Sequence, residues 1–208
     1  MSHIYISNKN RNVFCVNQKV GFSTFESLCK NRALSKITFS STEFKNNPAF
    51  VIVRNPLARL LSFYNHWIID VKKNRKFKAF CQHQLTAVYE KDFIISEQFS
   101  FSNLVHAINI KTKYFFINQH HVPQHRIYQE ISSANDNVNY IKMEGPKFNP
   151  ITSKLIGVDH LPRVNSQPKN QTHPNAISLD RVDKSDIATV EKLYKKDYEI
   201  FDYKNDIS

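Results

Sequence analysis

Two short apolar runs, each followed by a loop and an amphipathic segment, constrain the fold of this chain more than any other feature. Residues 13–16 (VFCV) and 50–53 (FVIV) are continuous apolar tetrapeptides, which are typical of strands buried on both faces of a parallel sheet. The segments 23–31 and 57–68 that follow them carry apolar residues at helical spacing. The sequence therefore predicts a three-layer α/β fold with a central parallel sheet covered by helices.

Length, composition and charge narrow the function classes. With 208 residues, 41% of them hydrophobic, the chain can form a sizeable core, and we expect a single domain over residues 1–208. The formal net charge of +11 indicates an anionic partner. The three cysteines show no metal-ligand spacing, so we expect neither a disulfide framework nor a structural zinc site. Because the chain has no apolar run of membrane-spanning length and a polar N-terminus, we expect a cytoplasmic protein without an integral membrane span.

Spacing and turn residues predict the remaining elements. We expect helices over residues 99–110 and 185–201, and strands over residues 114–117 and 138–143. Residues 146–174 contain five prolines, so we expect an irregular segment there.

The loop after the first apolar run combines groups that bind anions. Lys19 supplies a positive charge, and Gly21 allows a ligand to approach the backbone. Ser23 and Thr24 supply hydroxyl groups, and the spacing of Ser23 and Glu26 predicts a capping box at the start of the next helix. The loop therefore predicts a P-loop-like strand-loop-helix site for phosphate or sulfate, although it is not a Walker A motif, since the lysine precedes the glycine. The alternative is a capped helix beside a solvated turn lysine.

The second strand-loop-helix unit places Arg54 at the end of its strand and a polar helix face behind it. Asn55 and Pro56 are typical of a helix start, and we expect Arg59, Ser62 and His66 to share the polar face. Guanidinium and hydroxyl groups that converge there could hold a second phosphate. The alternative is a charged helix face and an arginine bonded to carbonyl groups at the strand end.

Taken together, these two segments resemble the motifs of carbohydrate sulfotransferases that use 3′-phosphoadenosine 5′-phosphosulfate (PAPS). Residues 18–24 are similar to P-K-x-G-x-[ST]-[ST], and residues 53–64 are similar to V-R-[DN]-P-x-x-R-L-x-S-x-Y. Residues 120–124 resemble H-x-x-P-Q, residues 160–166 resemble P-H-x-N-x-S, and residues 194–203 resemble the terminal Y-x-x-D-[FY]-x-x-F-x-Y. Four residues differ from the usual ones of this family, since Gln18 replaces a usual Pro, Asn55 a frequent Asp, Val122 an Arg of many relatives and Asp202 a Gly.

The resemblance implies that the chain transfers a sulfuryl group from PAPS to a carbohydrate hydroxyl, without a metal. The carbohydrate could be a polysaccharide, an oligosaccharide or a glycolipid, and it could be anionic. The implied donor-binding residues are Lys19, Gly21, Phe22, Ser23 and Thr24 at the 5′-phosphosulfate, and Arg54 and Ser62 at the 3′-phosphate. Lys19 would also stabilise the leaving group.

A base must accept the proton of the acceptor hydroxyl, and imidazole suits this role at neutral pH. His120 is the first choice because it matches the first residue of H-x-x-P-Q, and His121 is the alternative. Glu144 is a further candidate base, and its alternative role is that of a structural carboxylate paired with an arginine.

The acceptor is the less specified partner. We expect it to contact His121, Arg163 and Lys169, and the basic run at residues 72–78 is either a solvated helix end or a strip that attracts an anionic glycan. Two competing functions stay open, namely a non-catalytic anion- or glycan-binding protein on the same fold and a basic nucleic-acid-binding domain. We do not expect nucleic acid, because few aromatic residues alternate with the basic ones.

Overall fold

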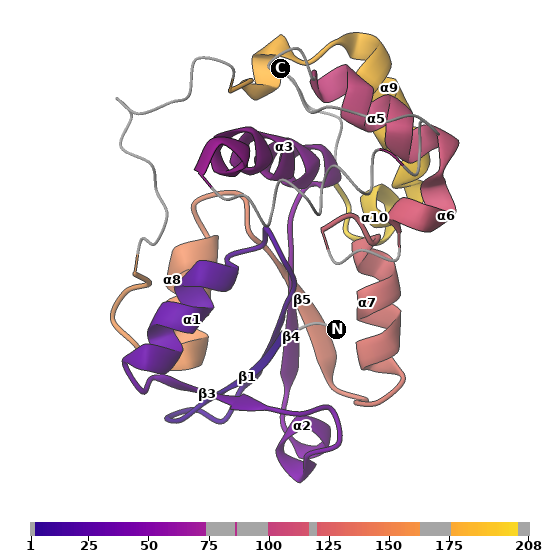
Figure 1. The fold of residues 1–208 in the computed structure, drawn as a ribbon. Helices are drawn as coiled ribbons and strands as arrows, with labels where there is room; N and C mark the ends of the chain where they lie inside the picture. Colours follow the sequence, from indigo (N-terminus) through magenta and orange to yellow (C-terminus); the bar gives the residue numbers. More distant parts are fainter. Residues whose placement is uncertain (1–2, 74–85, 87–99, 117–119, 163–175, 204–208) are drawn as a thin grey trace. The chain divides into compact units, whose positions relative to one another are not determined.

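The computed structural model describes residues 3–73, 86, 100–116, 120–162 and 176–203 (Figure 1). The chain divides into two compact units. The first unit consists of Met1–Asn55, Pro123–Gln167 and Lys196–Tyr203. The second unit consists of Pro56–Val122, Pro168–Lys195 and Lys204–Ser208.

The first unit contains a five-stranded sheet. Its strands are β1 (His3–Ser7), β2 (Val13–Val16), β3 (Leu34–Ile37), β4 (Ala49–Val53) and β5 (Val138–Lys142), in the order β3-β1-β2-β4-β5. Strands β2, β4 and β5 are parallel, which confirms the predicted α/β class, but β1 is antiparallel to both β2 and β3. The sheet is therefore mixed, because β1 and β2 are joined by a short turn, and a turn of that length can connect only antiparallel neighbours.

Helices cover both faces of this sheet (Figure 1). Helices α1 (Phe22–Lys30) and α8 (Phe148–Ile156) lie on one face, where they enclose a core that includes Phe14, Phe25 and Ile52. Helix α7 (Gln124–Ser132) lies on the other face, where aromatic rings of α7, β5 and the segment after α10 (Lys195–Ile200) pack edge to face. A short helix, α2 (Thr42–Asn46), connects β3 to β4.

Helix α8 corrects the prediction of an irregular segment over residues 146–174. Pro150 lies in the first turn of α8, where a missing backbone N–H costs no hydrogen bond. The last residue of β1 holds the other end of this helix, since the buried Ser7 hydroxyl donates a hydrogen bond to the Ile156 carbonyl at 2.6 Å. Residues 163–174 lie outside the described residues.

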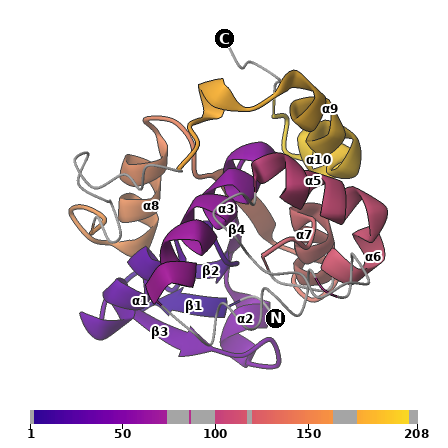
Figure 2. The same ribbon diagram turned by 45° about the horizontal axis from the view of Figure 1, so that its top comes forward.

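The second unit is helical in its described part. It contains α3 (Pro56–Lys73), α5 (Phe101–Ile110), α6 (Thr112–Phe115), the short 3-10 helix Leu179–Arg181 and α9 (Lys184–Leu193). Helix α3 packs against α5 and α9, and Figure 2 shows α5 beside α9. The predicted helix at 99–110 is confirmed with a later start, because Ser100 caps α5 in a capping box with Asn103.

Two predictions in this part of the chain are wrong. Residues 114 and 115 belong to helix α6 and not to the strand expected over residues 114–117. The buried ring of Phe115 packs against His121. The predicted helix at 185–201 is divided into α9 and α10 by Tyr194, which has φ −111° and ψ 22°. The buried Tyr194 hydroxyl donates to the His121 carbonyl at 2.9 Å, and this contact accompanies the break.

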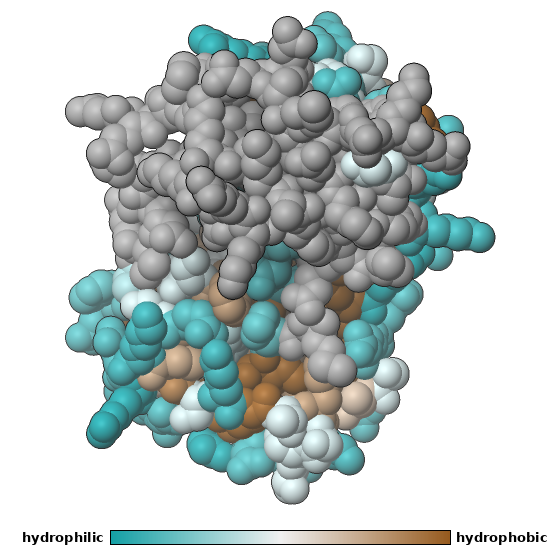
Figure 3. Space-filling model, viewed as in Figure 1, coloured by the Kyte–Doolittle hydropathy of each residue, from teal (hydrophilic) through white to brown (hydrophobic). Residues whose placement is uncertain are grey.

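Figure 3 shows hydrophilic residues around a smaller hydrophobic area at the level of the sheet. Within the part of the chain that the structure describes, no helix has the length and apolar character needed to cross a membrane.

A buried histidine lies in the core of the second unit. The His121 side chain is 1% exposed, its ring packs edge to face against Phe63 and Phe115, and neither ring nitrogen has a hydrogen-bond partner among the described residues. Burial lowers the pKa of His121 well below its usual range, and the neighbouring His120 and Arg59 act in the same direction. The folded protein therefore holds this imidazole neutral.

Replacement of His121 by phenylalanine is expected to flatten the acid side of the stability profile. Because the pKa is lower in the folded chain than in the unfolded chain, the unfolded chain binds more protons below pH about 6.5, so stability falls as the pH falls. One proton contributes a slope of at most about 1.4 kcal/mol per pH unit. Urea unfolding between pH 8 and pH 5 should show this slope in the wild type and a shallower one in His121→Phe.

The control is His106→Gln, which removes an exposed imidazole from α5 of the same unit and should keep the wild-type slope. Parallel profiles for wild type and His121→Phe would show that the buried imidazole does not contribute.

Candidate functional site

The loop between β2 and α1 has two residues with left-handed backbone conformations. Lys19 has φ 66° and Gly21 has φ 85°, and Gly21 is the N-cap residue of α1. Turns of this kind direct successive backbone N–H groups into a concave surface that binds anions. A Cβ atom on Gly21 would meet Phe25 at no less than 3.9 Å, so the backbone conformation, rather than a lack of space within the protein, explains the glycine.

The predicted capping box at Ser23 is wrong. Helix α1 begins one residue earlier, at Phe22, and no side chain caps it. Glu26 instead accepts hydrogen bonds from the Tyr5 hydroxyl at 2.6 Å and from Lys36 at 3.0 Å, so it is engaged by the sheet. Ser23 and Thr24 therefore lie inside the first turn, where both are half-buried.

A groove lined by both polar and apolar residues lies beside this first turn. It has a volume of about 550 Å³, and Pro162, one of its lining residues, accepts a hydrogen bond from the Thr24 hydroxyl at 3.4 Å. Asn149, Ser153, Asp159 and His160 supply polar groups to its wall. The structure thus brings the segment at 160–162 to the first turn of α1, although the two are far apart in the sequence.

Arg54, which follows β4, contacts the loop that follows β2. One terminal nitrogen of its guanidinium group donates a hydrogen bond to the Lys19 carbonyl at 3.1 Å. Its Nε lies 3.7 Å from Oε1 of Glu144, and a quarter of the Arg54 side chain is exposed. Burial lowers the pKa of Arg54, and the Glu144 carboxylate opposes this effect. Lys19 and Arg54 therefore follow the carboxyl ends of the neighbouring strands β2 and β4, at the same edge of the sheet. The sequence analysis assigned these two positively charged residues to one site.

Glu144 is held by several groups at this edge. Its Oε1 accepts the Asn55 backbone N–H at 2.8 Å, and its Oε2 accepts the Tyr203 hydroxyl at 3.1 Å. Burial, together with the Glu144 charge, raises the pKa of Tyr203. These contacts are those of a structural carboxylate that pairs with an arginine.

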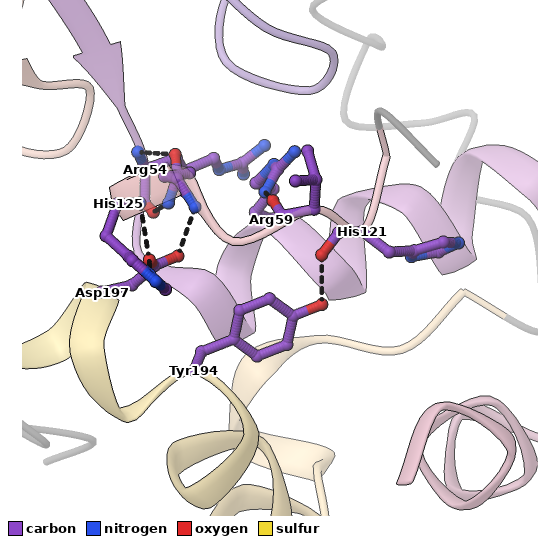
Figure 4. Close-up of polar contacts among 8 residues, drawn as sticks. Arg54, Arg59, His121, His125, Tyr194 and Asp197 are labelled. Carbon is purple, nitrogen blue, oxygen red and sulfur yellow. Dashed lines mark hydrogen bonds and ion pairs between the residues drawn. The ribbon is translucent and has the colours of Figure 1, made fainter. Parts of the chain in front are cut away.

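Gln124, which the sequence analysis did not select as a site residue, is bonded to Arg54, and Asp197 and His125 lie behind it. The Gln124 side-chain amide bonds both backbone polar groups of Arg54, and the Asp197 carboxylate bonds the backbone N–H groups of Gln124 and His125 (Figure 4). Gln124 and Asp197 stand at fixed positions of two motifs that the sequence resembles, H-x-x-P-Q and Y-x-x-D, and that position was the available signal. Nothing in the sequence indicated their contacts.

The remaining candidate residues belong to the second unit or lie outside the described residues. Ser62 and His120 are half-buried, and the His120 ring centroid is 5.1 Å from that of Phe63. His121 is buried, so its substrate-binding role stays a prediction. Arg59 does not lie on an exposed polar face as expected, since it is 2% exposed and donates to the Val122 carbonyl at 2.8 Å. Arg163, Lys169 and residues 74–78 of the basic run lie outside the described residues.

Side chains that could bind a metal are dispersed in the described part of the chain, where no three of them form a cluster. The groups that the site offers are instead positive charges, hydroxyls and the N–H groups at a helix start, and this combination suits an anionic ligand.

Comparison with known proteins agrees with this chemistry. The family model described as "Sulfotransferase family" matches residues 6–204, which include nearly all of both units. No curated protein and no solved structure matches the chain. The match contains the loop before α1, the end of β4 and the segments that bring Gln124 and Asp197 to Arg54. The chain belongs to the sulfotransferase family.

Proposed function

We propose that this sulfotransferase transfers the sulfuryl group of PAPS to a hydroxyl of a carbohydrate, and that residues 1–208 act as one sulfotransferase domain. The observation that carries the proposal is the hydrogen bond from the Arg54 guanidinium to the Lys19 carbonyl, which joins the two segments that resemble donor motifs. PAPS carries phosphate groups at both the 5′ and the 3′ positions of its ribose, so its binding requires two positively charged subsites near each other.

The residues at this edge fit such a donor. Lys19, Gly21, Phe22, Ser23 and Thr24 lie in the loop before α1 and in its first turn, and the N-terminus of a helix attracts anions through its dipole. A guanidinium has five N–H donors, and the described contacts of Arg54 use one in a hydrogen bond and leave Nε at 3.7 Å from a carboxylate. Arg54 therefore retains donors for the 3′-phosphate, and we assign Ser62 to the same phosphate.

The proposed reaction is an in-line displacement at sulfur. The acceptor oxygen forms a bond to sulfur while the bond from sulfur to the bridging phosphate oxygen breaks, and 3′-phosphoadenosine 5′-phosphate (PAP) leaves. Negative charge develops on the bridging oxygen, where the Lys19 ammonium group and helix N–H groups would stabilise it. PAPS supplies the sulfuryl group, and the protein supplies charge, orientation and a base.

The acceptor proton passes to a base, and we assign this role to His120. Its alternatives are less suitable, because His121 is buried and Glu144 is engaged by three groups around Arg54. The acceptor itself, with contacts to His121, Arg163 and Lys169, and the cytoplasmic location stay expectations from the sequence.

Replacement of either donor-binding cation is expected to weaken PAP binding. Loss of a charge-assisted hydrogen bond costs about 1.5–3 kcal/mol, which is roughly a 10- to 150-fold increase in Kd, so Lys19→Ala and Arg54→Ala should each show a change of this size by calorimetry. In thermal unfolding, PAP should raise the Tm of the wild type and raise it less in both variants.

Lys30→Ala is the matched control, since it removes an exposed lysine from the last turn of the same helix and should bind PAP like the wild type. If saturating PAP does not raise the Tm of the wild type, or if both variants keep wild-type affinity, the donor site is wrong.

Replacement of His120 by alanine is expected to separate binding from transfer. The variant should bind PAP normally but transfer labelled sulfate from PAPS to a carbohydrate panel about 10²- to 10⁴-fold more slowly, as expected for loss of a general base. His106→Ala, which removes an exposed histidine of the second unit, should keep the wild-type rate. PAP binding by the wild type without transfer to any carbohydrate would favour a glycan-binding protein that lacks the activity.

A further inference from the structure

Gln124 fixes the backbone of Arg54. This glutamine is the first residue of α7 and is 2% exposed. Its Oε1 accepts the Arg54 backbone N–H at 2.8 Å, and its Nε2 donates to the Arg54 carbonyl at 2.6 Å. Arg54 directly follows β4, which ends at Val53, so the sheet no longer determines its backbone conformation. One buried side chain therefore satisfies both backbone polar groups of the residue.

Asp197 in turn fixes the start of α7. Its carboxylate is fully buried, with Oδ2 accepting the Gln124 N–H at 2.8 Å and Oδ1 accepting the His125 N–H at 2.8 Å (Figure 4). His125 Nδ1 lies 2.6 Å from Oδ1. The N-cap residue of α7 is Pro123, whose side chain cannot accept a hydrogen bond, so Asp197 of α10 replaces the missing cap.

These contacts hold the backbone from which the Arg54 side chain extends. An arginine side chain has several rotatable bonds and loses considerable entropy when it is ordered, so a fixed backbone reduces the cost of holding it in a binding conformation. In this structure the fixed backbone accompanies a guanidinium that lies between the Lys19 carbonyl and Glu144. The conformation of Arg54 is therefore set by residues from three separate parts of the chain.

We propose that Gln124 and Asp197 are positioning residues, which hold Arg54 in the conformation that binds the 3′-phosphate of the donor. Neither residue needs to touch the donor. The inference rests on the proposed function, in which Arg54 binds that phosphate. It predicts that selectivity for a nucleotide with a 3′-phosphate depends on a buried carboxylate in the C-terminal helix α10.

The test compares two nucleotides that differ in one group. PAP carries the 3′-phosphate and adenosine 5′-monophosphate (AMP) does not, so the ratio of the Kd for AMP to the Kd for PAP measures the contribution of that phosphate. By calorimetry, Gln124→Met and Asp197→Asn should lower this ratio about tenfold, the effect of one hydrogen bond to a charged group, with little change in the Kd for AMP. A general loss of structure would weaken the binding of both nucleotides.

The matched control is Asn135→Leu. Asn135 is also a buried amide of the first unit, and its Nδ2 donates to the carbonyl groups of Phe44 and Asn47 rather than to Arg54. This variant should lower the Tm and leave the nucleotide ratio unchanged. Combining Gln124→Met with Arg54→Ala should lower the ratio no further than Arg54→Ala alone, since both changes remove the same contribution.

The outcomes separate the two proposals. A wild-type ratio near one, or a ratio that Arg54→Ala does not change, would overturn both the phosphate assignment and the inference. A ratio that falls in Arg54→Ala and keeps its wild-type value in folded Gln124→Met and Asp197→Asn would overturn the inference alone. Equal loss of AMP and PAP binding would also overturn it.

Gln124→Glu serves if the other variants do not fold. It keeps one oxygen for the Arg54 N–H and places the second oxygen near the Arg54 carbonyl, so it should lower the ratio. A wild-type ratio in this variant would overturn the inference.

Discussion

The carboxylate of Asp197 is fully buried, and the arrangement of the first unit depends on how it is compensated. A buried carboxylate costs several kcal/mol unless hydrogen-bond donors replace the lost water. Here two backbone N–H groups and the His125 ring replace it. The need is reciprocal, because the first N–H groups of α7 have no acceptor within the helix and Pro123 offers none. The hydrogen bonds between Asp197 of α10 and the start of α7 therefore compensate both the buried carboxylate and the unpaired N–H groups of the helix.

The same contact extends to the end of β4 through Gln124, which Asp197 holds and which in turn bonds Arg54. Strand β4 ends at Val53, and the chain leaves the sheet there with backbone groups that need partners. Gln124 supplies them for Arg54, and Glu144 supplies one for Asn55. The charged side chains at this edge are thus mounted on a backbone that hydrogen bonds have already fixed, which is the condition for binding an anion without a large entropic cost.

The sequence predicted the parts of the fold that local pattern determines. The buried strands at residues 13–16 and 50–53, both helices that follow them and the strand near residue 138 are present, because continuous apolar runs and helical spacing report burial directly. The predictions were wrong where tertiary contacts determine the secondary structure. The strand expected at residue 114 is helix α6, and the terminal helix breaks at Tyr194, whose hydroxyl bonds a distant carbonyl. The first strand was missed because its five residues precede a polar turn and give little periodicity.

In the candidate site, too, local sequence pattern predicted some residues, and tertiary contacts that the sequence does not indicate involve others. Lys19 and Arg54 were selected because their residue types and positions indicate anion binding, and they lie together as expected. Gln124 and Asp197 could not be selected on chemical grounds, since an amide and a carboxylate far apart in the sequence do not indicate that they bond the same backbone. The burial of Arg59 was equally hidden, because its position on the helix looked polar and its carbonyl partner lies beyond residue 120.

The first unit is built from three segments that are far apart in the sequence, and this affects how the protein folds during synthesis. Residues 1–55 leave the ribosome long before residues 123–167, which supply β5, α7 and α8, and residues 196–203 come later still. Strand β4 can therefore pair with its parallel neighbour β5 only after β5 has been synthesised, and Asp197 can bond the start of α7 only later still. Contacts of such large sequence separation slow folding. The nascent chain must therefore keep the apolar face of β1, β2 and β4 protected from aggregation until its last helix has emerged.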